Sequence, residues 1–434
     1  MTATAPATGA ELHGLAARLF PIARSLTGPG LRETLGVLEE VAGAPMEIHR
    51  WATGTQVFDW TIPEEWTIRD AWVRDPDGRT VVDFADSNLH VLGYSEPVHR
   101  RLALEELQGH LHSLPELPHA IPYLTSYYAR RWGFCLPHER RERLVPGEYE
   151  VFIDADLGPG HVELGEVTLP GERDDEILFS TYVCHPSLAN NELSGPVIAA
   201  HLARHLRDRP RRFTYRILFL PETIGSIAYL HRFGDRLLER LRAGYVITCA
   251  GDPGEFTYKR SRRGDSLADR TAEHVLRAAG APHRVVDFFP SGSDERQFCS
   301  PGFDLPVGSL MRTMYGTYPE YHTSLDDLEF VTPDGLGGTL EMYVAIVDAL
   351  EANETLATTV PHCEPQLGKR GLYPTLGSGR ERQERVDDTM WLLNLCDGTR
   401  DLLAVAERAG RPLAALAPVV AELKAAGLLA AAAG

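Results

Sequence analysis

The sequence predicts an α/β protein with a mostly parallel, doubly wound sheet, an inserted mainly β domain and a C-terminal winged helix. Between residues 166 and 355, near-continuous apolar runs such as "EILFSTYV" and "TYRILFLP" alternate with amphipathic stretches such as "SGPVIAAHLARHLRD". Parallel strands covered by helices on both faces have this pattern. Residues 47–165 contain short alternating runs such as "QVFDWTI", separated by Pro, Gly and Asp, which is typical of a mainly β unit. The end of the chain contains three short helical patterns that resemble a winged helix.

The elements follow in this order along the chain. Residues 1–46 are predicted to add two helices to the α/β domain, "GAELHGLAARLFPIAR" and "GLRETLGVLEEVAG", with a turn, "RSLTGPG", between them. The insertion follows at 47–165, and its aromatic stretch "YLTSYYARRWGFCL" is interpreted as packing between units. The α/β domain resumes at 166–360. We expect 361–434 to form a polar joint, at about 362–385, followed by the winged helix.

A winged helix raises the question of DNA binding, and the charges of this segment argue against it. From Val386 to the end, four basic side chains (Arg400, Arg408, Arg411 and Lys424) stand against six acidic ones. Phosphate affinity depends on clustered Lys and Arg. The segment is therefore predicted to serve packing or protein interaction.

Composition sets broad limits on the function. The 434-residue chain has a formal net charge of -18, which argues against nucleic acid or an anionic membrane surface as the main partner. No signal peptide or membrane span is recognisable, so a cytoplasmic protein is expected. The six cysteines have no close pairs, which indicates neither a disulfide framework nor a thiolate zinc site. A small-molecule or peptide-like substrate is the expected partner, and a homo-oligomer stays open.

Polar residues gather on four segments that follow apolar strands or lie on Gly, Ser or Pro turns. They are "CHPSLANNELSG" with His185, Asn191 and Glu192, "LPETIGS" with Glu222, "SGSDERQF" with Asp294, and "EYHTSLDD" with Tyr321, His322 and Asp326. Taken singly, each is better explained structurally, Glu222 as a helix cap and Asp294 as a turn residue. Ligands of open α/β sheets bind beyond the carboxyl ends of the strands. Two imidazoles and one or two carboxylates at that edge predict a zinc site with an open position for water.

These four segments, in this order, resemble the metal-dependent aminopeptidases of the M28 type. The resemblance is to the bacterial DUF4910 aminopeptidase-like branch, which has an inserted β domain and a C-terminal winged helix, and it covers nearly the whole chain. It implies a zinc-peptidase-like sheet. It also implies that His185 and His322 bind metal, and that Glu222 is the general base that takes a proton from water. Tyr321 matches a tyrosine that polarises the tetrahedral intermediate, and Asp294 matches a turn near the metals.

The chain also departs from that family's pattern. Asn190, Asn191 and Glu192 stand where typical relatives have Asn-Asp-Asn with a bridging Asp, and a neutral amide is a poor bridge between two cations. The second of the paired acids is Thr223, and a later Asp ligand is replaced near Thr248 unless Asp252 takes its place.

Three outcomes stay open for the metal content: one zinc, two metals with a shifted ligand set, or none. We favour one zinc per chain, held by His185, His322 and either Glu192 or Asp294, with water as the fourth ligand.

Two functions are weighed. The first is a zinc-dependent aminopeptidase-like hydrolase that cleaves an amide bond of a small peptide-like or amino-acid-derived substrate, with Glu222 and Tyr321 as catalytic residues. An exopeptidase also needs an acid for the substrate amine, for which the sequence offers Glu192, Glu295 and Glu320. Asn191 and Glu320 are the predicted substrate-binding residues. The alternative is a non-catalytic binding or scaffold protein on a degenerate peptidase fold, which the changes at Asn191 and Thr223 favour.

Overall fold

The computed structural model describes residues 6–372 and 379–432, and the chain divides into two compact units. The first unit comprises Met1–Ala268 and His283–Glu341, and the second comprises Asp269–Pro282 and Met342–Gly434. The predicted fold class is confirmed: a mostly parallel α/β sheet, separate antiparallel sheets and a C-terminal winged helix are all present.

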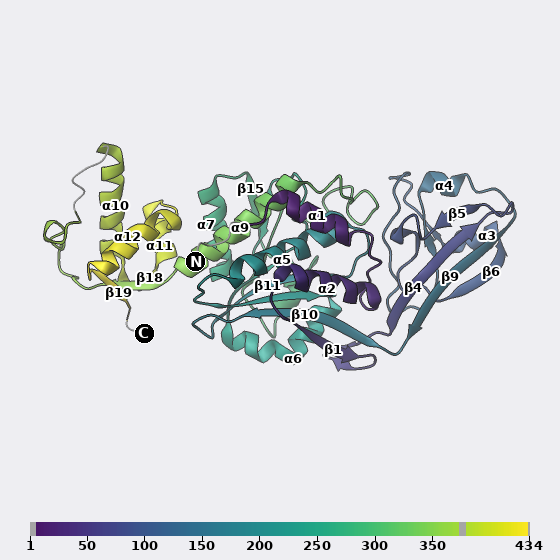
Figure 1. Ribbon diagram of the computed structural model, residues 1–434, viewed down its shortest axis with the longest axis horizontal. Coiled ribbons are helices and arrows are strands. Elements are labelled where there is room, and N and C mark those ends of the chain that lie inside the picture. The colour runs from purple at the N-terminus through teal and green to yellow at the C-terminus, as the bar shows by residue number, and fades with distance from the viewer. Residues whose placement is uncertain (1–5, 373–378, 433–434) are drawn as a thin grey trace. The chain divides into compact units, whose positions relative to one another are not determined.

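An eight-stranded mixed sheet forms the centre of the first unit (Figure 1). Its strands in spatial order are β1 (Met46–Ala52), β10 (His161–Leu169), β12 (Thr214–Leu220), β11 (Glu176–Tyr182), β13 (Leu241–Val246), β16 (Val307–Met311), β14 (Phe256–Lys259) and β15 (His283–Val286). The neighbouring strands β12, β11, β13 and β16 run parallel to one another. Every residue of β11 is buried, as its apolar run predicts.

Helices cover both faces of this sheet. Helices α1 (Gly9–Leu19) and α2 (Pro29–Ala42) pack against α5 (Ser194–Arg207) on one face, and α6 (Ile224–Arg240) lies on the other (Figure 1). Thr8 and Glu11 form a capping box at the start of α1. The helix ends at Leu19, five residues before the predicted end at Arg24. Pro21 explains the early end, because proline has no backbone N–H with which to continue the helical hydrogen bonds.

The inserted segment contains a four-stranded antiparallel sheet in the order β5-β4-β9-β6. The strands of the insertion are β2 (Gln56–Val57), β3 (Trp60–Thr61), β4 (Glu65–Arg74), β5 (Thr80–Asp83), β6 (Val98–Ala103), β7 (Leu111–His112), β8 (Phe134–Cys135) and β9 (Glu148–Gly158). Its short helices are η1 (Asn88–His90), α3 (Leu104–Leu107), η2 (Gln108–His110) and α4 (His138–Glu142). Strands β1 and β10, at the two ends of the predicted insertion, pair with each other in the main sheet. One hydrophobic core joins both parts, with Trp66 and Val151 in the same cluster as Tyr182 and Leu218.

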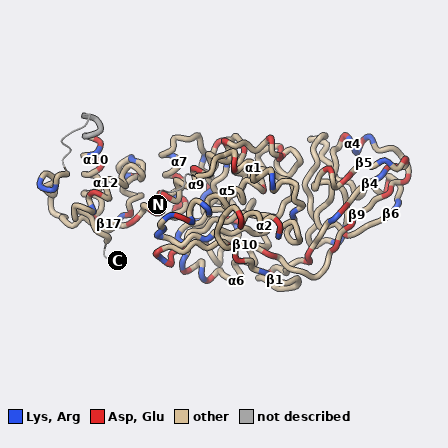
Figure 2. The backbone as a smooth tube through the Cα atoms, in the orientation of Figure 1, with Lys and Arg blue, Asp and Glu red and all other residues tan. Residues whose placement is uncertain are grey.

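The second unit contains the winged helix. Helix α7 (Leu267–Ala279) begins at the end of the first unit, and α9 (Pro333–Ala352) continues from the first unit into the second. The remaining elements are β17 (Thr355–Thr358), η4 (Gly368–Arg370), α10 (Gly379–Leu395), β18 (Asp397–Asp401), α11 (Leu402–Ala409), α12 (Leu413–Ala425) and β19 (Leu429–Ala431). Helix α10 begins inside the stretch 362–385 that its Gly and Arg content predicts as an irregular joint. Basic and acidic residues are interspersed along this unit (Figure 2).

None of the helices in the described ranges has both the length and the apolar character needed to cross a bilayer.

A buried histidine of α5 gives the fold a pH-dependent stability. His201 is 5% exposed, and neither ring nitrogen has a hydrogen-bond partner among the described residues. Burial lowers the pKa of His201 to about 4, whereas an unfolded histidine titrates near about 6.5. The unfolded chain therefore binds the proton first, so this contribution to stability is complete above about pH 6.5 and declines as the pH falls towards 4.

When the pH is lowered from 7 to 5, we expect the free energy of unfolding of the wild type to fall by about 2 kcal/mol more than that of His201→Leu. Urea unfolding of the wild type and the variant at both pH values measures this difference. An equal loss of stability in the two proteins would contradict the assignment to His201.

Candidate active site

The ends of β11 and β12 bring two of the predicted motifs together at one edge of the main sheet. The strands are parallel neighbours, with Tyr182 paired to Leu220, so the chain leaves both at the same edge. The loop after β11 carries Cys184 and His185, and the loop after β12 carries Glu222. The backbone N–H of Glu222 donates to Sγ of Cys184 over 3.3 Å, which ties the two loops together.

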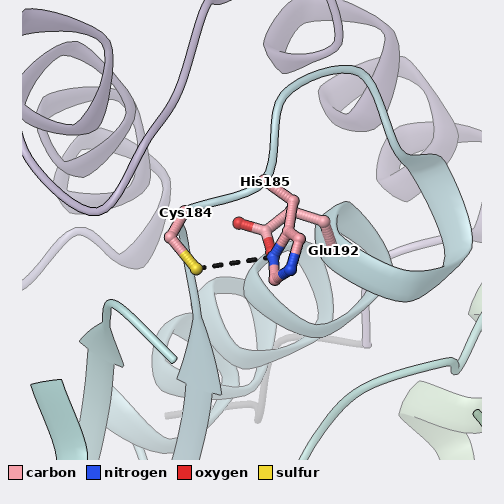
Figure 3. A group of neighbouring side chains, drawn as sticks. All are labelled: Cys184, His185 and Glu192. Carbon is pink, nitrogen blue, oxygen red and sulfur yellow. Dashed lines mark hydrogen bonds and ion pairs between the residues drawn. The ribbon is translucent and has the colours of Figure 1, made fainter. Parts of the chain in front are cut away.

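His185 and Glu192 form a buried pair at the centre of the site (Figure 3). Nδ1 of His185 lies 2.7 Å from Oε2 of Glu192, and the two residues are 2% and 1% exposed. Glu192 lies on η3 (Ala189–Leu193), a single π-helical turn at the start of α5. Such turns often occur at functional sites, because the extra residue changes the direction of the side chains. Burial lowers the pKa of His185, but the charge and hydrogen bond of Glu192 outweigh it, so the pKa is raised.

Two buried carboxylates hold this π turn in place. Asp326 accepts the backbone N–H groups of Asn190 and Asn191 over 2.5 and 2.9 Å. Asp252 accepts the side-chain amide of Asn190 over 2.9 Å, and the backbone N–H and hydroxyl of Thr313 over 3.1 and 2.6 Å. Asp252 is thus engaged in structural hydrogen bonds, which weighs against it as a ligand for a second metal.

Glu222 lies next to His185 in a mostly buried position. Its Oε2 is 3.7 Å from Nε2 of His185, and its side chain is 22% exposed. Burial raises the pKa of Glu222 to about 8; the nearby His185 opposes the rise and Asp294 adds to it. A carboxyl group whose pKa is raised towards neutrality is suited to proton transfer.

His322 faces His185 from the loop that follows β16. The two imidazole centroids are 5.4 Å apart. The ring of Tyr321 stacks on that of His322, with centroids 4.0 Å apart and planes 12° apart. Burial lowers the pKa of His322 to about 3, and the neighbouring His185 adds to this effect. His322 is therefore a neutral imidazole, the form that binds metals.

Left-handed backbone conformations cluster at the strand ends. Ser187, Thr223, Cys249 and His322 have φ values of 45°, 64°, 47° and 57°. They lie in the loops that follow β11, β12, β13 and β16, one in each loop. Non-glycine residues pay about 1–3 kcal/mol for such conformations, which persist mainly at functional sites.

Asp294 lies behind the Glu222 loop. Its Oδ1 accepts the backbone N–H of Thr223 and the hydroxyl of Ser226, both over 2.8 Å. The following residue, Glu295, begins α8 (Glu295–Phe298) and forms a fully buried ion pair with Lys259 over 2.7 Å. Burial raises the pKa of Asp294 to about 6, and the hydrogen bond from Thr223 opposes the rise. These contacts make Asp294 a support for the Glu222 turn.

The predicted substrate-binding residues lie on two different loops. Asn191 is 1% exposed, and its side-chain N–H donates to the hydroxyl of Tyr182 over 3.0 Å. Glu320 is half-buried and lies two residues before His322, and its backbone carbonyl accepts from Thr323. Substrate contact by Asn191 or Glu320 stays a prediction.

The residues at this site fit a zinc ion. Within the described ranges, the buried side-chain atoms without a hydrogen-bond partner include Oε1 of Glu192, Nε2 of His322 and Oδ2 of Asp294. Buried polar atoms are nearly always paired, so each such atom indicates an additional partner. Imidazole nitrogen and carboxylate oxygen are ligands that zinc prefers. Ligand atoms of Cys184, His185 and Glu192 also lie within 4.8 Å of one another (Figure 3).

Cys184 belongs to this group, but its contacts indicate a supporting role. Its Sγ accepts the N–H of Glu222 and lies 3.4 Å from Nδ1 of His185. Burial raises the pKa of the thiol well above its ordinary value. We expect Cys184→Ser to lower zinc affinity by no more than about 100-fold, the upper end of the effect of a group outside the ligand shell. Competition with a chromogenic chelator measures this affinity, and a larger loss would make Cys184 a ligand.

Two residues of the site have no recognisable signal in the sequence. Arg24 is 1% exposed; its Nε donates to the backbone carbonyl of His185 over 3.1 Å, and its Nη1 to that of Leu19 over 2.6 Å. Tyr123, in the stretch interpreted as packing, places its ring 4.8 Å from that of His185. Neither residue type nor spacing connects Arg24 or Tyr123 to His185, because both contacts arise only from the tertiary fold.

Comparisons with known proteins agree with this architecture. Residues 13–353 match the family model described as "Domain of unknown function (DUF4910)", and residues 354–431 match a winged helix-turn-helix model. A protein of Clostridium acetobutylicum is 46% identical over 403 residues, which are 93% of this chain and 92% of that protein. Its name provisionally assigns it to polysaccharide biosynthesis, with an aminopeptidase-like domain.

Two crystal structures are also similar to this chain. One, from Clostridium acetobutylicum and provisionally described as a peptidase, is 43% identical, with a TM-score of 0.91 over 97% of this chain and 96% of that one. The other is a zinc aminopeptidase of Bacillus subtilis, 13% identical, with a TM-score of 0.57 over 79% of this chain and 95% of that one. At this low identity, the second similarity concerns the fold alone.

Proposed function

Because this chain belongs to the DUF4910 family of aminopeptidase-like proteins with a C-terminal winged helix, we propose that its strand-end site is a zinc-dependent amide hydrolase. The substrate we propose is a small peptide-like or amino-acid-derived compound. The observation that carries the proposal is the environment of His185, which contacts Glu192 over 2.7 Å, lies 3.7 Å from Glu222 and has its ring centroid 5.4 Å from that of His322. Two of these residues present buried ligand atoms, Oε1 of Glu192 and Nε2 of His322, that have no partner in the described part of the chain.

The ligand set that we propose is His185, Glu192 and His322. Glu192 is preferred to Asp294 as the carboxylate, because it contacts His185 directly, whereas Asp294 is hydrogen-bonded to the Glu222 turn. Three protein ligands leave one position of a tetrahedral zinc site open. When bound, zinc would supply a Lewis acid and lower the pKa of a water molecule to roughly 7.

The protein groups supply the remaining chemistry. Glu222 accepts the proton of the attacking water and then delivers it to the leaving amine, the usual sequence for a general base that becomes a general acid. Tyr321, stacked on His322, donates a hydrogen bond from its hydroxyl to the oxyanion that develops on the amide carbonyl. Asp294 and Cys184 hold the Glu222 loop through its backbone N–H groups.

Metal content and hydrolysis test this proposal together. We expect about one zinc per chain in protein purified without a metal-affinity tag, measured by mass spectrometry, and its loss from the double variant His185→Ala, His322→Ala. We expect the zinc-loaded wild type to hydrolyse members of a panel of aminoacyl amides with a fluorogenic leaving group. Absence of bound zinc, combined with no uptake of added zinc, would overturn the hydrolase proposal.

A binding or scaffold role is the second candidate. The observation that favours it is the neutral Asn191 in place of a bridging carboxylate, together with the structural hydrogen bonds of Asp252. If the protein has this role, we expect the wild type to bind neither zinc nor the amides of the substrate panel. We also expect the double variant His185→Ala, His322→Ala to be as stable as the wild type.

The relative's name suggests where such a hydrolase would act. The related Clostridium protein is provisionally assigned to polysaccharide biosynthesis, so amide-bearing building blocks of a polysaccharide belong in the substrate panel.

We also propose that the winged helix contacts protein rather than nucleic acid, because from Val386 to the end its four basic residues are outnumbered by six acidic ones. We therefore expect the protein to elute from a heparin column below about 0.15 M salt, since exposed charges are largely screened at that ionic strength. Retention at higher salt would contradict this expectation.

A further inference from the structure

We propose that Tyr123 is a positioning residue, through which the inserted domain fixes the orientation of the two imidazoles of the metal site. The inference rests on the proposed zinc site and goes beyond it, because it assigns to the insertion a part in metal binding. It is carried by three independent sets of contacts: a backbone connection to the His322 loop, ring contacts with both histidines, and an aromatic connection to the inserted sheet.

The backbone connection joins residues 121–123 of the insertion to the loop that carries His322. The N–H of Tyr123 donates to the carbonyl of His322 over 2.8 Å. The N–H of Ser324 donates to the carbonyl of Ile121 over 2.8 Å, and Oγ of Ser324 accepts the N–H of Ile121 over 3.0 Å. Pro122 and Thr323 form an antiparallel bridge between these bonds. The insertion therefore fixes the backbone of His322, whose φ of 57° is unfavourable on its own.

The ring of Tyr123 contacts both imidazoles of the proposed ligand set. Its centroid is 4.8 Å from that of His185, with planes 58° apart. It is 5.3 Å from that of His322, with planes 86° apart, which is an edge-to-face arrangement. One rigid ring thus restricts the orientation of two imidazoles, His185 and His322, that lie 137 positions apart in the sequence.

A chain of aromatic residues connects Tyr123 to the sheet of the inserted domain. Tyr123 lies close enough to Tyr127 to affect it: burial raises the pKa of Tyr127, and the side chain of Tyr123 opposes the rise. The ring of Tyr127 lies 6.1 Å from that of Tyr94, and Tyr94 stacks on Trp66 of β4 at 5.7 Å. Trp66 is itself fixed, because its indole N–H donates to the carbonyl of Ser95 over 2.9 Å. The position of Tyr123 is therefore set by the core of the insertion and not by a free surface loop.

Groups that orient metal ligands affect metal affinity without touching the metal. Loss of such a partner typically weakens binding by about 10–100-fold, because the ligands must then be ordered when the metal binds. In most metal sites a hydrogen bond to the second nitrogen of the imidazole provides this restraint. Here the ring of Tyr123 contacts both imidazoles, and the ring of Tyr321 also stacks on His322, so aromatic contacts provide the restraint.

The experiment measures zinc affinity by chelator competition, and the visible absorption spectrum of the cobalt(II)-substituted protein, in full-length variants. Tyr123→Phe keeps the ring, and Tyr123→Leu removes it while keeping apolar bulk. The matched control is Tyr128→Leu, because Tyr128 is in the same loop, is 53% exposed and hydrogen-bonds the carbonyl of Thr61. Thermal unfolding confirms that each variant is folded.

We expect Tyr123→Leu to bind zinc about 10–100-fold more weakly and to show an altered cobalt spectrum, with Tyr123→Phe and Tyr128→Leu close to the wild type. Wild-type affinity and spectrum in Tyr123→Leu would overturn the inference while leaving the proposed hydrolase intact. A loss in Tyr123→Phe equal to that in Tyr123→Leu would also overturn it, because the hydroxyl rather than the ring would then be responsible. A wild type that binds no zinc would instead refute the proposed function.

Discussion

Replacing Glu222 with glutamine is expected to lower kcat by about 10²–10⁴-fold, the usual contribution of a general acid–base group. Glutamine has nearly the same shape but cannot accept the proton of the attacking water. The backbone N–H of Glu222, which donates to Cys184, is unaffected by this substitution. Zinc content and zinc affinity are expected to stay at wild-type values, because Glu222 is not in the proposed ligand set.

The matched control is Glu239→Gln on α6, the helix that follows the Glu222 turn. The side chain of Glu239 is 76% exposed, so we expect this variant to keep wild-type kcat and zinc content. Measurement of kcat with the best amide of the fluorogenic panel, together with zinc content, separates the possible roles of Glu222. Loss of zinc together with loss of kcat in Glu222→Gln would make Glu222 a ligand and not a base.

Arg216→Met is expected to destabilise the first unit by about 3–5 kcal/mol, the typical cost of removing one partner from a buried ion pair. Arg216 is 5% exposed on β12, and its guanidinium donates to both carboxylate oxygens of Glu176 over 2.9 and 2.8 Å. It also forms an ion pair with Glu166. Glu166 and Glu176 are 4% and 2% exposed, so the substitution leaves two buried carboxylates without their main counter-charge.

Arg69→Met provides the control for this experiment. Arg69 on β4 pairs with Asp154 and Asp156, but its side chain is 46% exposed. Exposed ion pairs contribute about 0–1 kcal/mol, so a change within that range is expected. Urea unfolding followed by tryptophan fluorescence measures both variants. A cost below about 1 kcal/mol for Arg216→Met would show that the buried network relaxes or admits water.

The sequence was sufficient for the fold class and for the strand-end positions of His185 and Glu222. Apolar strands alternate with amphipathic helices over a long stretch, and parallel strands must end at a common edge, which is where His185 and Glu222 lie. The end of the first helix was harder to predict from the sequence. The apolar spacing continues beyond Leu19 and predicted a longer helix, but Pro21 ends the helix.

The contacts within the site could not be predicted from the sequence. The pairing of Glu192 with His185 depends on a π-helical turn, and an α-helical turn of the same residues would aim Glu192 elsewhere. The resemblance left Asp252 as a replacement for a later Asp ligand, and its bonds to Asn190 and Thr313, which weigh against that role, arise only in the folded chain. These features depend on side-chain packing across loops distant in the sequence, which no local pattern encodes.

The connection between Ile121–Tyr123 and the loop at His322 bears on the order of events during synthesis. The contact joins residues separated by about half of the chain. The hydrogen bond from Arg24 to the carbonyl of His185 likewise cannot form until His185 has been synthesised. Contacts of such high sequence separation form late, because the entropy of closing a long loop must be overcome first. A ribosome-bound chain that already contains the inserted sheet and His185 therefore has no complete site until His322 has emerged from the exit tunnel. The proposed site is therefore completed only near the end of translation of the first unit, and chains released earlier lack it.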